Sequence, residues 1–187
     1  MERLTGRLIR RRALLSAMLI GFVMSSCLQS ETKPVVDLDL LAGDWEGIFE
    51  YLDYSDDATR MSLPASLIVT LPEKGDGTGG PAEAALQFTY REDSGADAVE
   101  EVVLRYYPSE SLVDFNGNWA VIDSQTDPQS AYLYLVFTGS GEDGDREALI
   151  RQTIERSGDT LLLRREVRYG EVSDYIVRNE YRLHLVN

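Results

Sequence analysis

The 187-residue sequence predicts an all-β protein whose strands form an antiparallel up-and-down β-barrel of nine or ten strands. Three observations predict this fold. Apolar residues after Gly43 recur at every second position, which is the period of a strand and not of a helix. Turn-forming residues separate these apolar rows at short intervals. The connections are too short for parallel crossovers, so neighbouring strands should be antiparallel.

The two-residue period is clear along most of the chain. Between Met61 and Leu71, apolar side chains alternate with mostly polar neighbours, and a late row places Arg165 among Leu161, Leu163 and Val167. Such strands need a closed barrel or a sandwich to protect their edges. We expect strands to start near these residues, in chain order: Trp45, Met61, Ala84, Val99, Leu112, Asn118, Ala131, Ala148, Thr160 and Ser173.

The segments between the rows are rich in turn-forming residues. Asn116-Gly117 favours a tight hairpin, because both residues tolerate positive φ. A three-residue loop there would place Phe115 opposite Trp119 and Val113 opposite Val121, matching apolar side chains on one face. We expect the other turns at residues 72–81, 91–97, 123–130, 139–145, 157–159 and 170–171.

Composition and charge exclude several classes of function. The 18 Lys and Arg residues against 32 Asp and Glu give a net charge of −14, which disfavours binding to nucleic acid because phosphates need basic partners. One cysteine and one histidine exclude an intramolecular disulfide, a cysteine-based zinc site and a multi-histidine metal site. No catalytic arrangement stands out, so we expect neither an enzyme nor a metal or cofactor. The acidic segments 53–57 and 142–145 are interpreted as solvated turns.

The first residues have the pattern of an export signal. A basic start is followed by an uninterrupted run of apolar and small residues at 13–24. A run of about 12 residues is too short to cross a hydrocarbon core, which needs roughly 20. This order of segments is typical of a secretory signal peptide. We therefore expect a signal peptide at residues 1–26, a flexible tether at 27–39 and a barrel domain at 40–187.

The end of the apolar run, Met24-Ser25-Ser26-Cys27, resembles the lipobox of bacterial lipoproteins. The resemblance implies cleavage before Cys27 and lipidation of this cysteine. Leu28 after the cysteine implies an outer-membrane anchor with the domain in the periplasm; an inner-membrane anchor and plain secretion remain as alternatives. Residues 11–15, Arg-Arg-Ala-Leu-Leu, also resemble a twin-arginine export motif, so both the general and the twin-arginine export routes stay open.

The pair Gly43-x-Trp45 at the start of the first strand resembles the opening of lipocalins. The resemblance implies a barrel whose base is plugged by Trp45, with a late-strand arginine packed over it as a cation–π contact. Arg178 is the candidate match and Arg182 the second. Arg178 shares the outward row of its strand, so this packing requires either a curled barrel end or a bulge. The segments 45–54 and 178–181 are also similar to bacterial lipocalin-like proteins without an assigned activity.

Small barrels are either filled by side chains or hold one ligand. Aromatic residues on the strands suit a partly polar pocket, because tyrosine offers both a ring and a hydroxyl. We expect a membrane-anchored periplasmic lipoprotein that binds a small hydrophobic or amphipathic molecule in the barrel. The alternative is an envelope protein-interaction module whose barrel is filled. The candidate ligand-binding residues are Tyr51, Phe88, Tyr90, Tyr106, Trp119, Tyr134 and Tyr181.

Overall fold

The computed structural model describes residues 36–72, 81–91, 95–170 and 174–186. The predicted signal peptide, Cys27 and most of the predicted tether lie outside the described residues. No helix within the described ranges is long and apolar enough to span a membrane. Val36 and Leu38 are buried in the core, so core packing begins shortly before residue 40.

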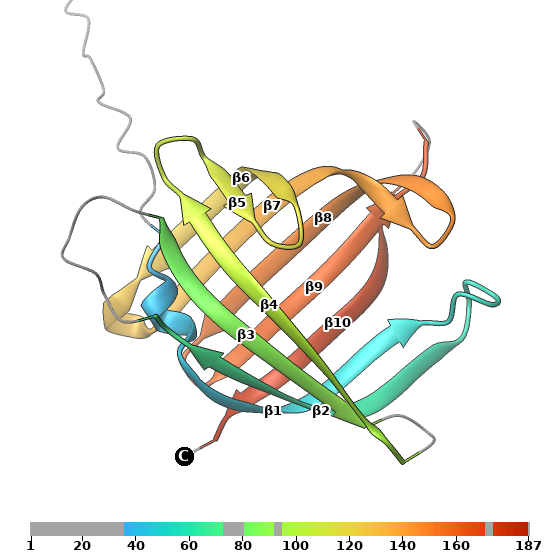
Figure 1. Ribbon diagram of the computed structural model, residues 1–187, viewed down its shortest axis with the longest axis horizontal. Helices are drawn as coiled ribbons and strands as arrows, with labels where there is room; N and C mark the ends of the chain where they lie inside the picture. Colours follow the sequence, from blue (N-terminus) through green and yellow to red (C-terminus); the bar gives the residue numbers. More distant parts are fainter. Residues whose placement is uncertain (1–35, 73–80, 92–94, 171–173, 187) are drawn as a thin grey trace, which may run out of the picture. The chain divides into compact units, whose positions relative to one another are not determined.

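Ten antiparallel strands of the described chain form one closed barrel, in which each strand pairs with its neighbours in sequence and β1 pairs with β10 (Figure 1). This confirms the predicted up-and-down β-barrel and is compatible with a lipocalin-like fold. Pairing of the first strand with the last closes the sheet, so that in the described chain each strand pairs with two neighbours over at least part of its length. The strands are β1 (Gly43–Leu52), β2 (Arg60–Thr70), β3 (Ala82–Arg91), β4 (Asp97–Tyr107), β5 (Leu112–Asp114), β6 (Asn118–Asp127), β7 (Tyr132–Asp143), β8 (Arg146–Ser157), β9 (Thr160–Arg168) and β10 (Ile176–Leu185).

The core begins at the short 3-10 helix η1 (Leu38–Leu41), which lies at one end of the barrel, and extends along the barrel interior. Its residues are the inward members of the alternating rows, such as Leu67, Leu104 and Leu135, each with an exposed fraction of 0%. We call the end that carries η1 the η1 end. The opposite end carries the β1–β2 and β7–β8 turns (Figure 1).

Trp45 lies at the η1 end with 1% of its surface exposed, and its indole Nε1 donates to the carbonyl of Leu41 at 3.0 Å. The cation over its ring is Arg156 of β8, with its guanidinium carbon 5.1 Å from the ring centroid. Arg156 also donates to the carbonyl of Leu40. Gly43 begins β1 at φ +137°, where a Cβ atom would lie 2.7 Å from Leu185 Cδ1.

The expectation that Arg178 packs over Trp45 is therefore corrected. Trp45 pairs with Leu185 at the far end of β10. Arg178 is seven residue steps from Leu185, which at about 3.3 Å per step is about 23 Å along the strand. A bulge between Val177 and Asn179 does turn Arg178 inward, to 1% exposure, but at the end opposite Trp45. The second candidate, Arg182, lies on the outer face and pairs with Glu50.

Three turn predictions also need correction. The hairpin at Asn116-Gly117 has the expected three-residue loop, but one residue earlier, because Phe115 N donates to Gly117 O at 2.9 Å. Val113 therefore pairs with Trp119, not with Val121. Strands β6 and β7 extend into the expected turns at 123–130 and 139–145. The polar residues in these two segments were interpreted as turn residues, but the exposed face of a strand is also polar.

One part of the barrel wall is incomplete. Strand β5 pairs with β4 only over Arg105–Tyr107, and β6 pairs with β7 only as far as Thr138. Residues 97–104 of β4 and 139–143 of β7 therefore have no strand between them in the described chain. We call this opening, with the β5–β6 hairpin at its base, the wall gap.

Candidate functional site

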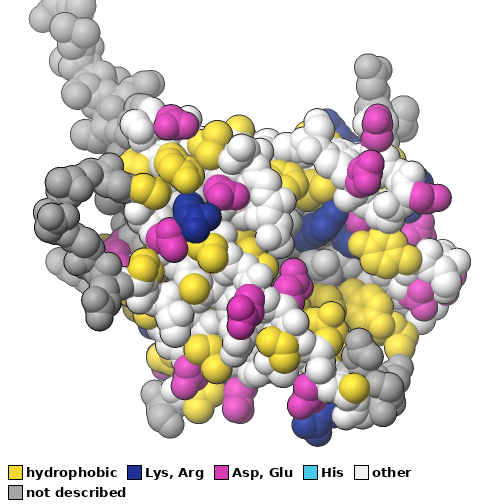
Figure 2. Space-filling model, viewed as in Figure 1, with side chains coloured by type: hydrophobic (Ala, Val, Ile, Leu, Met, Phe, Trp, Pro, Cys, Tyr) yellow, Lys and Arg dark blue, Asp and Glu magenta, His cyan; other side chains and the backbone are white. Residues whose placement is uncertain are grey.

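A cavity of about 410 Å³ lies inside the barrel next to the wall gap. Its lining includes both edges of the gap, with Glu100 and Val102 on β4 and Ser140–Glu142 on β7, and also the hairpin residues Asn116–Asn118. The cavity therefore opens sideways through the wall. Figure 2 shows the surface hollowed on this side of the barrel, with hydrophobic and basic side chains at the hollow.

Aromatic rings form two walls of the cavity. On one wall Phe49 of β1 stacks on Tyr181 of β10 with ring centroids 4.4 Å apart, and Phe88 of β3 lies 4.9 Å from Tyr181. On the other wall Phe137 contacts Phe115 edge to face at 5.9 Å and Trp119 at 6.3 Å. The rings on strands meet because each belongs to the inward row of its strand, and Phe115 joins them from the loop of the β5–β6 hairpin. They offer an apolar ligand a largely dry surface.

Polar groups gather on the part of the lining nearest the end opposite η1. Arg165 of β9 is flanked in register by Gln152 of β8 and Asn179 of β10, and all three line the cavity. Arg165 Nη2 donates to the backbone carbonyl of Glu142 at 3.0 Å, while Arg165 Nε is buried without a hydrogen-bond partner among the described residues. The cavity is therefore apolar on two walls and polar at one end.

Four of the seven predicted ligand-binding residues line this cavity: Phe88, Tyr90, Trp119 and Tyr181. Burial, and secondly the charge of Glu100, raise the pKa of Tyr181, so its hydroxyl stays protonated. The other three predicted residues lie elsewhere.

Tyr51 stacks on Phe49 at 5.4 Å but is not among the residues that line the cavity. Tyr106 is buried in the core, where burial raises its pKa. Tyr134 faces outward, because Leu133 and Leu135 on either side of it are fully buried. The expectation that Tyr134 lines the pocket thus took the wrong face of β7.

Several lining residues were not predicted. Phe137 belongs to the other face of the β7 row, and Gln152 and Asn179 carry no apolar signal. Arg165 had a visible signal, because it stands at an inward position between Leu163 and Val167. A charged residue inside an apolar row is a reason to expect a site.

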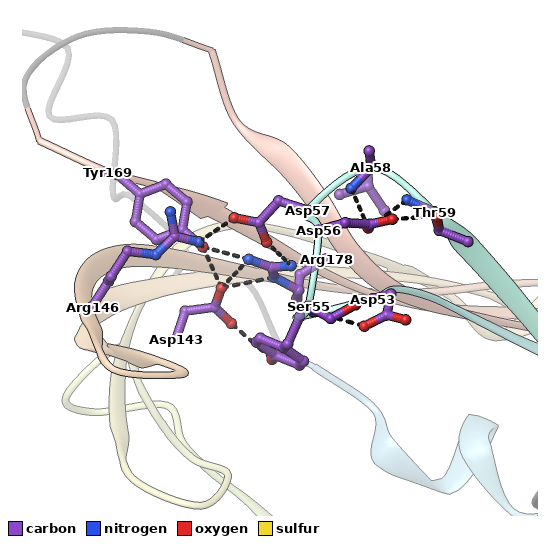
Figure 3. Close-up of polar contacts among 12 residues, drawn as sticks. Asp53, Ser55, Asp56, Asp57, Ala58, Thr59, Asp143, Arg146, Tyr169 and Arg178 are labelled. Atoms are coloured by element: carbon purple, nitrogen blue, oxygen red, sulfur yellow. Dashed lines mark hydrogen bonds and ion pairs between the residues drawn. The ribbon is translucent and has the colours of Figure 1, made fainter.

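A second polar cluster closes part of the end opposite η1 (Figure 3). Asp143, at the end of β7, has no exposed side-chain surface. It accepts hydrogen bonds from Tyr54 Oη at 2.9 Å, from Arg178 Nε at 2.7 Å and from Tyr169 Oη. The interpretation of residues 142–145 as a solvated turn is therefore wrong at Asp143, because strand β7 carries it under the β1–β2 loop.

The β1–β2 loop is bound to this cluster through Asp57. Arg178 Nη1 donates to Asp57 Oδ1 at 2.8 Å, and Arg146 Nη2 donates to Asp57 Oδ2 at 2.6 Å (Figure 3). The ring of Tyr54 lies under the guanidinium of Arg178, at 4.4 Å from the centroid. We call these residues the latch: Tyr54, Asp57, Asp143, Arg146, Tyr169 and Arg178.

The latch is charged at neutral pH. Burial acts to raise the pKa of Asp143, but hydrogen bonds from Tyr169, Tyr54 and Arg178 outweigh it and hold this pKa below its usual range. The hydrogen bond from Arg178 likewise lowers the pKa of Asp57. Asp143 is thus a fully paired carboxylate, which suits a structural role better than a proton-transfer role. Among the described residues, no three His, Cys, Asp or Glu side chains are grouped to hold a metal ion.

Comparison with known proteins finds no family that matches the chain and no similar curated protein.

Proposed function

We propose that the barrel binds a small amphipathic molecule in the 410 Å³ cavity. The observation that carries this proposal is the combination of aromatic walls, a polar end and a sideways opening in one cavity of ligand size. The alternative function is a protein-interaction module whose barrel is filled by side chains. The presence of a cavity favours ligand binding over this alternative.

We further propose that the protein is a periplasmic lipoprotein anchored through Cys27. The lipobox resemblance supports this proposal. Beyond residue 27 the chain carries a net charge of −18, because residues 1–27 hold five arginines and one glutamate. An anionic bilayer repels such a chain, so a lipid would have to hold it there. Mass spectrometry of the membrane-extracted protein tests this: an unmodified Cys27 in the mature chain would contradict it.

The ligand-binding proposal is tested with N-phenyl-1-naphthylamine, a neutral amphipathic fluorophore, on the full chain. Val102 lines the cavity on β4, whereas its neighbour Val103 belongs to the outward row. Val102→Trp should fill the cavity and weaken binding by about tenfold or more, while Val103→Trp should leave binding unchanged. Circular dichroism checks that both variants keep the barrel.

Two results would contradict the proposal. One is a wild-type protein that neither binds the fluorophore nor carries a non-covalent adduct in native mass spectrometry after membrane extraction. The other is equal binding by the Val102 and Val103 variants, which would place the fluorophore outside the cavity.

A further inference from the structure

The guanidinium of Arg165 is only partly used by the protein. Two of its contacts come from one nitrogen: Nη2 donates to the carbonyl of Glu142 at 3.0 Å and lies 3.5 Å from Asp143 Oδ1, beyond a strong hydrogen bond. The buried Nε has no partner among the described residues. A buried donor without a partner costs free energy, so such a group is one that a ligand can satisfy.

The nearby carboxylates are already taken by other cations. Asp143 accepts from Tyr54, Tyr169 and Arg178, and Asp57 accepts from Arg146 and Arg178. Among the described residues, Asp143 lies 3.5 Å from Arg165 Nη2 but pairs more closely, at 2.7 Å, with Arg178. Arg165 thus shares this carboxylate with Arg178 and is only partly neutralised by it. Its positive charge lies inside the barrel, where the effective dielectric constant is lower than in water.

The neighbours of Arg165 can complete an anion site. Gln152 and Asn179 flank it on the adjacent strands and line the same cavity, so their amides can donate to the same acceptor. Two acidic residues, Glu100 and Glu142, also line the cavity at the wall gap, but both are exposed to solvent, which screens their charge. The opposite end of the cavity is aromatic and apolar.

We propose that the ligand is a single-chain amphiphile with a carboxylate head, and that Arg165 binds this head while the aromatic walls hold the tail. The inference rests on the proposed function and adds to it the charge of the ligand. A carboxylate accepts from guanidinium more strongly than a neutral hydroxyl does. The protein should therefore prefer an acid to the alcohol of the same chain length.

The test displaces N-phenyl-1-naphthylamine from the full chain with four competitors: dodecanoate, dodecanol, dodecyltrimethylammonium and acetate. The wild type should bind dodecanoate about tenfold more tightly than dodecanol. Arg165→Gln should reduce this preference to less than about threefold, and Arg165→Lys should keep part of it, because lysine retains the charge and loses the planar fork. Acetate should not compete, since it lacks a tail.

Arg91→Gln is the matched control. Arg91 has a 66% exposed side chain paired with Asp97, so its removal changes net charge by the same amount without touching the cavity. This variant should keep the wild-type preference. Binding of the neutral fluorophore by Arg165→Gln shows that the cavity of the variant is intact. In the wild type, the NMR signal of Arg165 Nε–H should shift with dodecanoate and stay in place with dodecanol.

The outcomes separate the two proposals. If the wild type binds dodecanoate and dodecanol equally, or prefers dodecyltrimethylammonium, the carboxylate inference is overturned while the cavity remains a binding site. If Arg91→Gln loses the preference as Arg165→Gln does, net charge and not Arg165 is responsible, which also overturns the inference. If neither the fluorophore nor any competitor binds, both proposals fall.

Discussion

Asp143 on β7 accepts a hydrogen bond from Arg178 on β10 at 2.7 Å, although 35 residues separate them in the sequence. Both side chains have an exposed fraction of 1% or less. The pair joins strands that are not neighbours in the barrel and carries the β1–β2 loop through Tyr54 and Asp57. The latch therefore fixes the shape of the end opposite η1.

Replacing Asp143 by asparagine should destabilise the protein strongly. The amide cannot neutralise Arg178, which would remain buried with only the exposed Asp57 as its carboxylate partner. Breaking a buried ion pair by removing one partner typically costs about 3–5 kcal/mol. Urea denaturation measures the change, with Asp145→Asn on the exposed turn as the control. A decrease in the free energy of unfolding below about 1 kcal/mol would show that Arg178 does not depend on the charge of Asp143.

The latch should also make stability depend on pH in the acidic range. The folded-state pKa of Asp143 lies below the unfolded value of about 3.9, so its contribution is complete above that value and is lost as pH falls through the folded pKa. We expect the free energy of unfolding to drop more steeply below about pH 4 in the wild type than in Asp143→Asn. Parallel curves for the two proteins would contradict this assignment.

The strands of the barrel could be predicted from the sequence because a strand with one buried face shows a simple alternation of apolar and polar residues. Leu67 and Leu104 could be assigned to the core from the rows around them, and the structure confirms both at 0% exposure. The alternation of apolar residues also placed Arg165 among buried neighbours. The alternation did not identify the face of Tyr134, because both faces of β7 are apolar in sequence and only the pairing of β7 with its neighbouring strands decides which face is inside.

The latch was not predictable in this way. Tyr54 and Asp143 are 89 residues apart, and Asp143 stands in an acidic segment that is typical of solvated turns. Asp143 is buried because the end of β7 meets the start of β10 and the β1–β2 loop, and these segments come together only when the barrel closes. The bulge that turns Arg178 inward is likewise invisible to a strict two-residue period.

The seam between β1 and β10 depends on Gly47. A Cβ atom there would collide with the carbonyl oxygen of Arg182 and lie 3.0 Å from Leu183 Cα, and both are backbone atoms that cannot move aside. Gly47→Ala should therefore cost about 1–3 kcal/mol. In the control Gly141→Ala, the nearest atom is the flexible Cδ1 of Ile150, so the cost should be smaller. Thermal unfolding compares them, and equal midpoints would show that the seam tolerates a side chain.

The two tryptophans of the chain can report where a ligand binds. Trp119 lines the cavity, with its Nε1 donating to Phe115 O at 2.8 Å, whereas Trp45 lies beneath η1 and outside the lining. In Trp45→Phe, where Trp119 alone emits, bound dodecanoate should shift the emission maximum, because it changes the polarity at the indole. In Trp119→Phe, where Trp45 alone emits, the same ligand should leave the maximum unchanged. A shift confined to Trp45 would place the ligand at the η1 end and not at the wall gap.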